Sequence, residues 1–333
     1  MDFLRVRQLS KANERGFSIE GVTFAQEPCQ NIAIAGETGS GKTTLLRMIA
    51  GLAQPDSGTI HFKNEPVIGP ADKLIPGHKG IVYLSQQFEL PNFLRVEQVL
   101  EYANEWNEKD AANLFEICRI EHLFKRRTDQ LSGGEKQRIA IARLLIMAPE
   151  LFLLDEPFSN TDPANKQILK TIIADISSEL KMSFIMVSHE PNDTLSWADE
   201  ILVMQHGKLV ERGNPVNLYT TPQLEYSAGL FGRYNHLPNW LPGVANQPGA
   251  VAIIRPEQVL VSADQTRLKG TLIRVAYFGH YFEADILVKS DSGNDTSLIV
   301  SRSQTHPGET GSGVYLRIDP VHMSYVTQNF NHP

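Results

Sequence analysis

The chain has 333 residues, a length that suits two domains better than one, and its 41% hydrophobic content is enough for ordinary cores. A formal net charge of −7 argues against a nucleic-acid partner, because proteins that bind phosphate backbones normally present a basic face. No apolar run approaches the roughly 20 residues that span a bilayer, we expect no signal peptide, and the two cysteines, Cys29 and Cys118, lack a metal-binding spacing.

The first 226 residues or so alternate short strands with helical stretches. Three half-exposed segments near the start predict antiparallel strands at Phe3–Gln8, Phe17–Phe24 and Thr59–Phe62. Four segments are apolar throughout, as parallel strands covered on both faces are: Ile32–Ala35, Ile81–Ser85, Leu151–Leu154 and Phe184–Ser188. Helices are predicted at Val96–Glu105, Ala111–Cys118, Glu135–Met147 and Asn165–Leu180, and a hairpin at Ile201–Met204 and Lys208–Glu211. The pattern predicts an open, mostly parallel α/β sheet with an antiparallel flank.

The remainder of the chain has a different character. Residues 227–249 are rich in glycine, proline and asparagine, which predicts a linker at 231–249. Beyond it we find short strands separated by glycine-containing turns, and no helical pattern. The strands are predicted at Val251–Ile254, Val259–Val261, Gly270–Ala276, Phe282–Val288, Ser297–Val300 and Val314–Ile318. Regular short strands of this kind predict a small all-β barrel.

A glycine-rich loop follows the first apolar strand. Residues 36–43 read Gly-Glu-Thr-Gly-Ser-Gly-Lys-Thr and match G-x-x-x-x-G-K-[ST] between a strand and a helix-like run. Such a loop can turn successive N–H groups inward as an anion nest, and the following helix adds its dipole. A glycine-rich turn without a ligand is the alternative, although the match arises by chance in roughly one chain in a hundred.

The loop therefore predicts nucleotide binding. Lys42 can reach the β- and γ-phosphates, and the Thr43 hydroxyl can ligate Mg²⁺. The predicted nucleotide-binding residues are Gly36, Glu37, Thr38, Gly39, Ser40, Gly41, Lys42, Thr43 and Thr44.

A second motif lies at residues 131–138, which read Leu-Ser-Gly-Gly-Glu-Lys-Gln-Arg. A helix capped by Ser132 after a glycine turn would explain it locally. Together with the upstream loop, it resembles the signature motif of ABC-type ATPases. A capped helix N-terminus with two glycines is also suited to a γ-phosphate. The resemblance implies a head-to-tail dimer in which Ser132, Gly133 and Gly134 of one copy complete the ATP site of the second copy.

The strand Leu151–Leu154 ends in two carboxylates, Asp155 and Glu156. Ligand sites of open α/β sheets lie at the carboxyl ends of strands, although an ordinary strand end is the alternative. In its place after the two motifs above, the segment resembles the Walker B element. The resemblance implies that Asp155 holds Mg²⁺ and that Glu156 orients and deprotonates the attacking water.

Further positions carry the same resemblance. Ser188-His189 closes the next strand and resembles the switch histidine, which would contact the γ-phosphate. Gln86 resembles the glutamine that senses Mg²⁺ and water, and is favoured over its neighbour Gln87. The segment Ser159-Asn160-Thr161-Asp162 resembles the loop that contacts the dimer partner, and an Asx turn before Pro163 explains it nearly as well.

One region departs from the family. Where an aromatic residue usually stacks on adenine, Asn13 lies nearest the usual position, with Phe17 as a candidate substitute. A preference for ATP over GTP is therefore not predicted from base stacking. The segment Phe88–Glu105 is expected to meet the transmembrane partner, although its apolar residues could equally be ordinary helical core.

The resemblance to the ABC ATPase covers residues 1–230, with a helical signature subdomain at about 86–148. Residues 250–333 resemble the TOBE-like, OB-like β domain of importer subunits. The stretches that carry this second resemblance are Ile254–Val259, Gly270, Phe278-Gly279 and Pro307–Glu309. A generic antiparallel β domain is the alternative.

Taken together, the resemblance implies the ATP-hydrolysing subunit of an ABC importer, located in the cytoplasm against the inner face of the cell membrane. Its catalytic residues would be Lys42, Gln86, Glu156 and His189, and Mg²⁺ would involve Thr43, Gln86 and Asp155. The implied partners are a second copy of the chain, permease subunits and, indirectly, a solute-binding protein, but no nucleic acid. The solute itself is not predicted.

Three alternatives compete with this interpretation. The ATPase of an exporter is disfavoured by the C-terminal β domain. A soluble ABC ATPase that acts on ribosomes or DNA would usually carry two cassettes or long coiled-coil insertions, and neither is apparent. A regulatory module that binds ATP without hydrolysing it would lack a catalytic residue, whereas Lys42, Asp155, Glu156 and His189 are all present.

Overall fold

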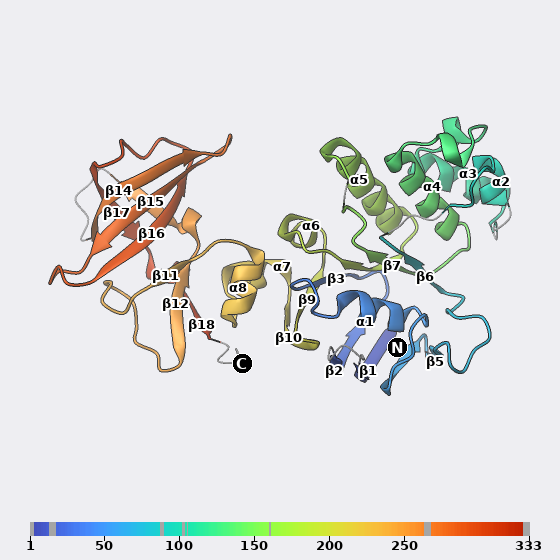
Figure 1. Cartoon of the computed structure of the whole chain (residues 1–333), viewed down its shortest axis with the longest axis horizontal. Helices are drawn as coiled ribbons and strands as arrows, with labels where there is room; N and C mark the ends of the chain where they lie inside the picture. The colour runs from blue at the N-terminus through green and yellow to red at the C-terminus, as the bar shows by residue number, and fades with distance from the viewer. Residues whose placement is uncertain are drawn as a thin grey trace. The chain divides into compact units, whose positions relative to one another are not determined.

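The computed structural model describes residues 3–12, 18–86, 90–101, 104, 106–159, 161–262 and 268–328. The chain divides into two units, Met1–Arg212 and Gly213–Pro333 (Figure 1). Each unit has its own clusters of buried apolar side chains. No helix among the described residues is both long enough and apolar enough to cross a membrane.

A six-stranded sheet with the strand order β10-β9-β3-β8-β7-β6 forms the centre of the first unit. Its strands are β3 (Asn31–Ala35), β6 (Ile81–Leu84), β7 (Leu151–Asp155), β8 (Ser183–Val187), β9 (Glu200–Gln205) and β10 (Lys208–Gly213). The first five of these pair in parallel, and every residue of β7 and β8 is buried, as the continuous apolar runs predicted. The turn His206-Gly207 joins β9 to its sheet neighbour β10.

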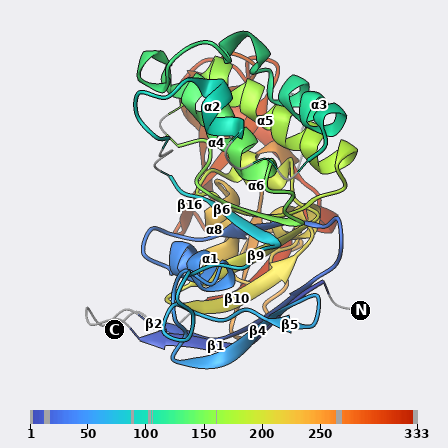
Figure 2. The ribbon, with the colours of Figure 1, turned by 90° about the vertical axis from the view of Figure 1, so that its right-hand side faces the viewer.

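An antiparallel sheet forms the predicted flank, with the order β2-β1-β4-β5. Its strands are β1 (Leu4–Ala12), β2 (Ser18–Gln26), β4 (Ser57–Phe62) and β5 (Glu65–Pro66). Helix α1 (Lys42–Ile49) lies between this sheet and the central sheet (Figure 2). Leu45, Leu46 and Ile49 share one apolar cluster with side chains of both sheets, which fixes the start of α1 at the carboxyl end of β3.

The opposite face of the central sheet is covered by a second group of helices (Figure 1). They are α2 (Val96–Glu101), α3 (Glu108–Cys118), α4 (Gly133–Leu145) and α5 (Pro163–Glu179), with the 3₁₀ turns Glu121–Leu123 and Thr128–Gln130 and the short helix α6 (Pro191–Leu195) nearby. Helices α4 and α5 begin two residues before the predicted starts, because Ser132 and Asp162 cap them. The apolar periodicity that guided the prediction does not extend into those first turns.

The second unit begins with α7 (Pro215–Thr220) and α8 (Glu225–Phe231) and continues as antiparallel sheets. A three-stranded sheet contains β11 (Asn235–Leu237), β12 (Ala250–Ile254) and β18 (Ser324–Thr327). A five-stranded sheet has the order β13-β17-β14-β15-β16. Its strands are β13 (Val259–Ser262), β14 (Leu268–Tyr277), β15 (Phe282–Lys289), β16 (Thr296–Ser303) and β17 (Gly313–Ile318).

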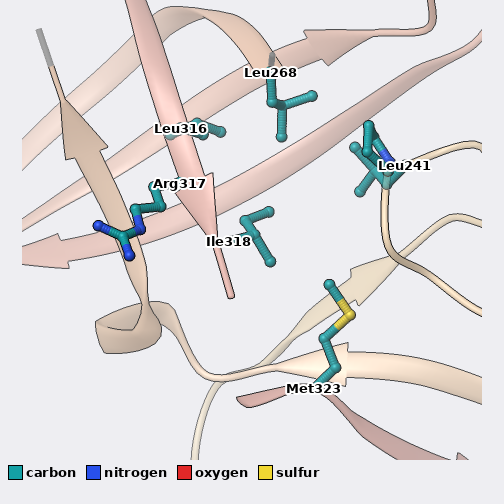
Figure 3. Close-up of a pocket in the computed structure, with 7 residues that line it drawn as sticks. Leu241, Leu268, Leu316, Arg317, Ile318 and Met323 are labelled. Atoms are coloured by element: carbon teal, nitrogen blue, oxygen red, sulfur yellow. The ribbon is translucent and has the colours of Figure 1, made fainter. Parts of the chain in front are cut away.

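The five-stranded sheet curls so that its edge strands meet. The Ser301 hydroxyl of β16 donates to the Val259 carbonyl of β13 at 2.5 Å, and the resulting half-barrel is consistent with the small β barrel predicted from the strand pattern. Within the segment expected to be a linker, Asn235–Leu237 forms β11 and pairs with β12. A pocket of about 210 Å³ in this unit is lined mainly by apolar side chains, together with Arg317 (Figure 3).

Candidate functional site

The glycine-rich loop joins β3 to α1, as predicted. An added Cβ at Gly36 would lie 2.3 Å from the Met204 carbonyl oxygen of β9, so the loop can pass this strand only with glycine at that position. Gly41 precedes α1 with φ of 101°, and within the described residues no side chain caps this helix. The first N–H groups of α1 are therefore left available for an anion.

Lys42 is the first residue of α1, and its side chain turns back onto the loop. Its ammonium donates to the carbonyl oxygens of Gly36 at 2.8 Å and Glu37 at 2.7 Å. Burial lowers the pKa of Lys42 below its ordinary value, while the charges of Glu156 and Asp155 oppose that shift. The loop thus holds a cation beside the free N–H groups of α1, which suits a polyphosphate.

Asp155 ends β7 and is only 5% exposed. Its Oδ1 accepts a hydrogen bond from the Thr43 hydroxyl at 3.0 Å, and its Oδ2 accepts one from the Tyr83 hydroxyl at 2.7 Å. Burial raises the pKa of Asp155 above its ordinary value. Thr43 and Asp155 were predicted to meet, whereas Tyr83 was not, because it stands inside the apolar run of β6.

Glu156 follows directly and adopts a left-handed backbone conformation with φ of 49°, which is costly for a residue with a Cβ. Its N–H donates to the Val187 carbonyl at 3.0 Å, which ties the turn to the end of β8. The Gln86 amide donates to Glu156 Oε2 at 3.3 Å, and His189 Nδ1 lies 3.5 Å from Oε1. Gln86 and His189, which were predicted from separate motifs, therefore both lie beside the Glu156 carboxylate.

The signature residues lie elsewhere in the same unit. Ser132 caps α4 in a reciprocal capping box with Glu135, as the local interpretation predicted. Ser132 and Gly133 are exposed, and an added Cβ at Gly134 would lie 2.7 Å from the Asn165 side chain. Helices α4 and α1 lie on opposite faces of the central sheet in both views (Figures 1 and 2). The signature therefore does not reach the phosphate loop of its own chain.

Several other predicted positions can now be placed. Asn13, Phe17, Gln87 and Asn160 lie outside the described residues. Asp162 caps α5 by accepting from the N–H groups of Ala164 and Asn165, which is the local Asx interaction that was the alternative for its loop.

The oxygen atoms at the end of β7 fit a nucleotide-bound Mg²⁺. The Thr43 hydroxyl and Asp155 Oδ1 lie 3.0 Å apart, and both are hard ligands. Across the described residues no group of three or more His, Cys, Asp or Glu side chains could hold a metal. Mg²⁺ is commonly bound by one or two protein oxygens together with substrate phosphates and water, so this small set suffices.

Comparison with known proteins identifies the family. Residues 19–159 match the family described as ABC transporter, and residues 252–326 match the TOBE domain. The chain is 34% identical over 295 residues to the Fe(3+) ions import ATP-binding protein of Rhodococcus jostii, an alignment that covers 83% of this chain and 84% of that protein. The chain belongs to the ABC transporter family of ATP-binding proteins.

Other relatives of this ABC ATPase agree. It is 33% identical over 308 residues to the sulfate/thiosulfate import ATP-binding protein of Vibrio cholerae, covering 89% of this chain and 77% of that protein. The solved structure of cbiO1 from Clostridium perfringens, part of the ABC transporter complex cbiONQ, aligns with a TM-score of 0.57 at 26% identity. That alignment covers 65% of this chain and 90% of the other. The predicted fold class and the prediction of an ATP-hydrolysing import subunit are confirmed at the level of the family.

Proposed function

We propose that two copies of this ABC ATPase close head to tail around two ATP molecules and that this closure drives a transmembrane permease. The observation that carries the proposal is the placement of Glu156, which lies between Gln86 and His189 and follows the Thr43–Asp155 pair. A carboxylate so placed beside a phosphate-binding loop can serve as a general base for water. The signature, by contrast, begins α4, which lies on the other face of the central sheet from α1.

In the proposed reaction the loop N–H groups and Lys42 bind the phosphates of ATP. Thr43 and Asp155 would hold Mg²⁺, which neutralises phosphate charge when bound. Glu156 takes the proton of the attacking water, while Gln86 and His189 hold its carboxylate in place. The chain adds little covalent chemistry, so positioning and charge neutralisation carry the reaction.

A second copy would supply what one chain lacks. Ser132 and Gly133 are exposed at the start of α4, which lies on the other face of the central sheet from α1 (Figure 1). A helix N-terminus of this kind can contact the γ-phosphate of ATP bound to a partner. We therefore assign Ser132, Gly133 and Gly134 to the nucleotide site of the second copy.

The dimer proposal is tested in a Glu156→Gln background, in which bound ATP should persist because the general base is gone. We expect this variant to elute as a dimer with ATP and Mg²⁺ and as a monomer without ATP, with turnover reduced at least about a hundredfold. Adding Ser132→Arg should abolish the dimer and leave ATP binding by the monomer intact. A dimer that forms equally with and without ATP, or that survives Ser132→Arg, would contradict the proposal.

An open groove of about 540 Å³ in the first unit offers a place for the permease. Three of its apolar side chains are exposed, Leu52 by 40%, Ile75 by 75% and Met147 by 40%. Exposed apolar side chains gathered at one groove mark an interaction site. Because the relatives are import ATP-binding proteins, we propose that a cytoplasmic segment of the permease docks here.

The segment Phe88–Glu105 was expected to meet that partner. Of its described residues, Phe93 is 68% exposed, whereas Val96, Val99 and Leu100 are buried on the inner face of α2. The buried part is therefore helical core, and a contact with the permease remains a proposal for the stretch around Phe93.

We also propose that the chain works at the cytoplasmic face of the membrane and that a separate solute-binding protein delivers the solute. Relatives that align with most of this chain are named for solutes as different as ferric iron and sulfate. Because similar ATPases are named for solutes of opposite charge, we infer that the ATPase does not select the solute. The ATPase supplies the energy, and the permease with its binding protein selects the solute.

A further inference from the structure

Both oxygens of the Asp155 carboxylate accept a hydrogen bond from a hydroxyl group. Thr43 donates to Oδ1 at 3.0 Å, and Tyr83 donates to Oδ2 at 2.7 Å. The two donors come from different elements, α1 and β6, which flank the end of β7. Tyr83 belongs to none of the motifs that define the site, yet its hydrogen bond to Asp155 is the shorter of the two.

The tyrosine is held from several sides. It stands on β6 opposite Leu153 of β7, and its ring packs against the apolar cluster that contains α1. The same ring lines the groove that we assign to the permease. A phenol is protonated at neutral pH, so the Tyr83 hydroxyl acts as the donor in this hydrogen bond.

A donor fixed in this way restricts how the carboxylate can rotate. With Oδ2 engaged by Tyr83, Oδ1 stays beside the Thr43 hydroxyl, and the two oxygens form a ready pair for a hard cation. Loss of a group that orients a metal ligand in this manner typically lowers metal affinity or activity by about 10- to 100-fold.

We propose that Tyr83 is a positioning residue for Mg²⁺: its hydroxyl holds Asp155 so that Oδ1 and Thr43 together accept the metal that accompanies ATP. The inference rests on the proposed function, in which Thr43 and Asp155 hold Mg²⁺. It adds a residue of β6 to a site otherwise built from the phosphate loop, the end of β7, Gln86 and His189.

The test is Tyr83→Phe, which removes the hydroxyl and keeps the packed ring. The affinity of the full chain for ATP is measured while Mg²⁺ is titrated, and again in EDTA. We expect ATP affinity in EDTA to change less than about twofold, and the Mg²⁺ concentration at half effect to rise about tenfold. Tyr219→Phe is the matched control, because Tyr219 donates to Glu257 at 2.6 Å in the second unit and should leave both values unchanged.

Failure of the role proposed for Tyr83 and failure of the proposed Mg²⁺ site would give different results. If Tyr83→Phe keeps the wild-type Mg²⁺ dependence, or loses ATP affinity equally in EDTA and in Mg²⁺, Tyr83 does not position the metal ligand. An equal shift in Tyr219→Phe would also overturn the inference. If the wild-type chain itself binds ATP without any response to Mg²⁺, the proposed metal site fails first, and that failure is read from the wild type alone.

Discussion

Each unit of this ATPase buries a cation among backbone carbonyls, and the two cations differ in what surrounds them. In the first unit Lys42 is 6% exposed and donates to two carbonyls of its own loop. It stands on a flexible stem in the field of Asp155 and Glu156. An ammonium on a flexible side chain can give up its hydrogen bonds to the loop carbonyls and donate to phosphate oxygens instead.

In the second unit Arg255 is 2% exposed and is fastened from several directions. Its guanidinium donates to the carbonyls of Tyr219, Ala228 and Gly232 at 2.8–2.9 Å and lies 4.2 Å from the centre of the Tyr219 ring. The planar guanidinium of Arg255, which follows β12, therefore connects that strand to α7, α8 and the turn after α8. A buried cation can therefore bind a ligand or stabilise the fold. Lys42 bonds carbonyls of its own loop, as a ligand-binding cation does, whereas Arg255 bonds carbonyls of other elements and so holds them together.

The largest effect is expected at Lys42. Lys42→Ala removes the cation that would meet the phosphates, and a charge-assisted contact of about 3 kcal/mol corresponds to about a hundredfold in Kd. We therefore expect ATP affinity to fall about a hundredfold or more, measured by calorimetry with Mg²⁺. The melting temperature without nucleotide should stay within about 2 °C, because Lys42→Ala also removes the cost of burying the ammonium, which offsets the two lost hydrogen bonds. A large drop in the melting temperature would instead show that Lys42, like Arg255, stabilises the fold.

Arg255→Lys should show the reverse behaviour. The charge remains, but lysine cannot bond three carbonyls in a plane or stack on Tyr219, so about 3 kcal/mol of stability should be lost. Hydrogen exchange should become faster in α8 and β12, while ATP affinity in the first unit stays unchanged. Arg317→Lys is the matched control, because Arg317 is exposed on β17. Equal exchange in the two variants would remove the structural role.

Much of the site could be predicted from the sequence because its residues stand in contiguous motifs. The phosphate loop and the two acids after β7 each carry a local pattern, and parallel pairing of β3, β8 and β7 brings their ends to one edge. Gln86 and His189 also lie at strand ends, so strand order alone places them near Glu156.

Tyr83 could not be found in this way. Inside an apolar strand its ring looks like core, and the ring does pack as core, while the hydroxyl reaches a neighbouring strand end. A tyrosine one strand away from a predicted metal ligand is the signal that could have indicated it. The short strand β11 was missed for a related reason: its pairing with β12 is non-local, and three residues carry too little periodicity to predict a strand.

The smallest effect is expected at exposed apolar side chains, where the groove of the first unit is compared with the surface of the second unit. Met147→Glu places a charge at a side chain that is already 40% exposed, so folding and ATP affinity should change little. If the permease docks there, burying that charge should cost roughly 1–2 kcal/mol, and recovery of the permease with the tagged chain from gently solubilised membranes should fall about tenfold. Ile273→Glu, at a residue of the second unit that is 47% exposed, is the control and should retain the permease. Equal recovery with both variants would move the docking site away from this groove. Loss with Ile273→Glu alone would transfer the role to the β domain and reverse the contrast between the units.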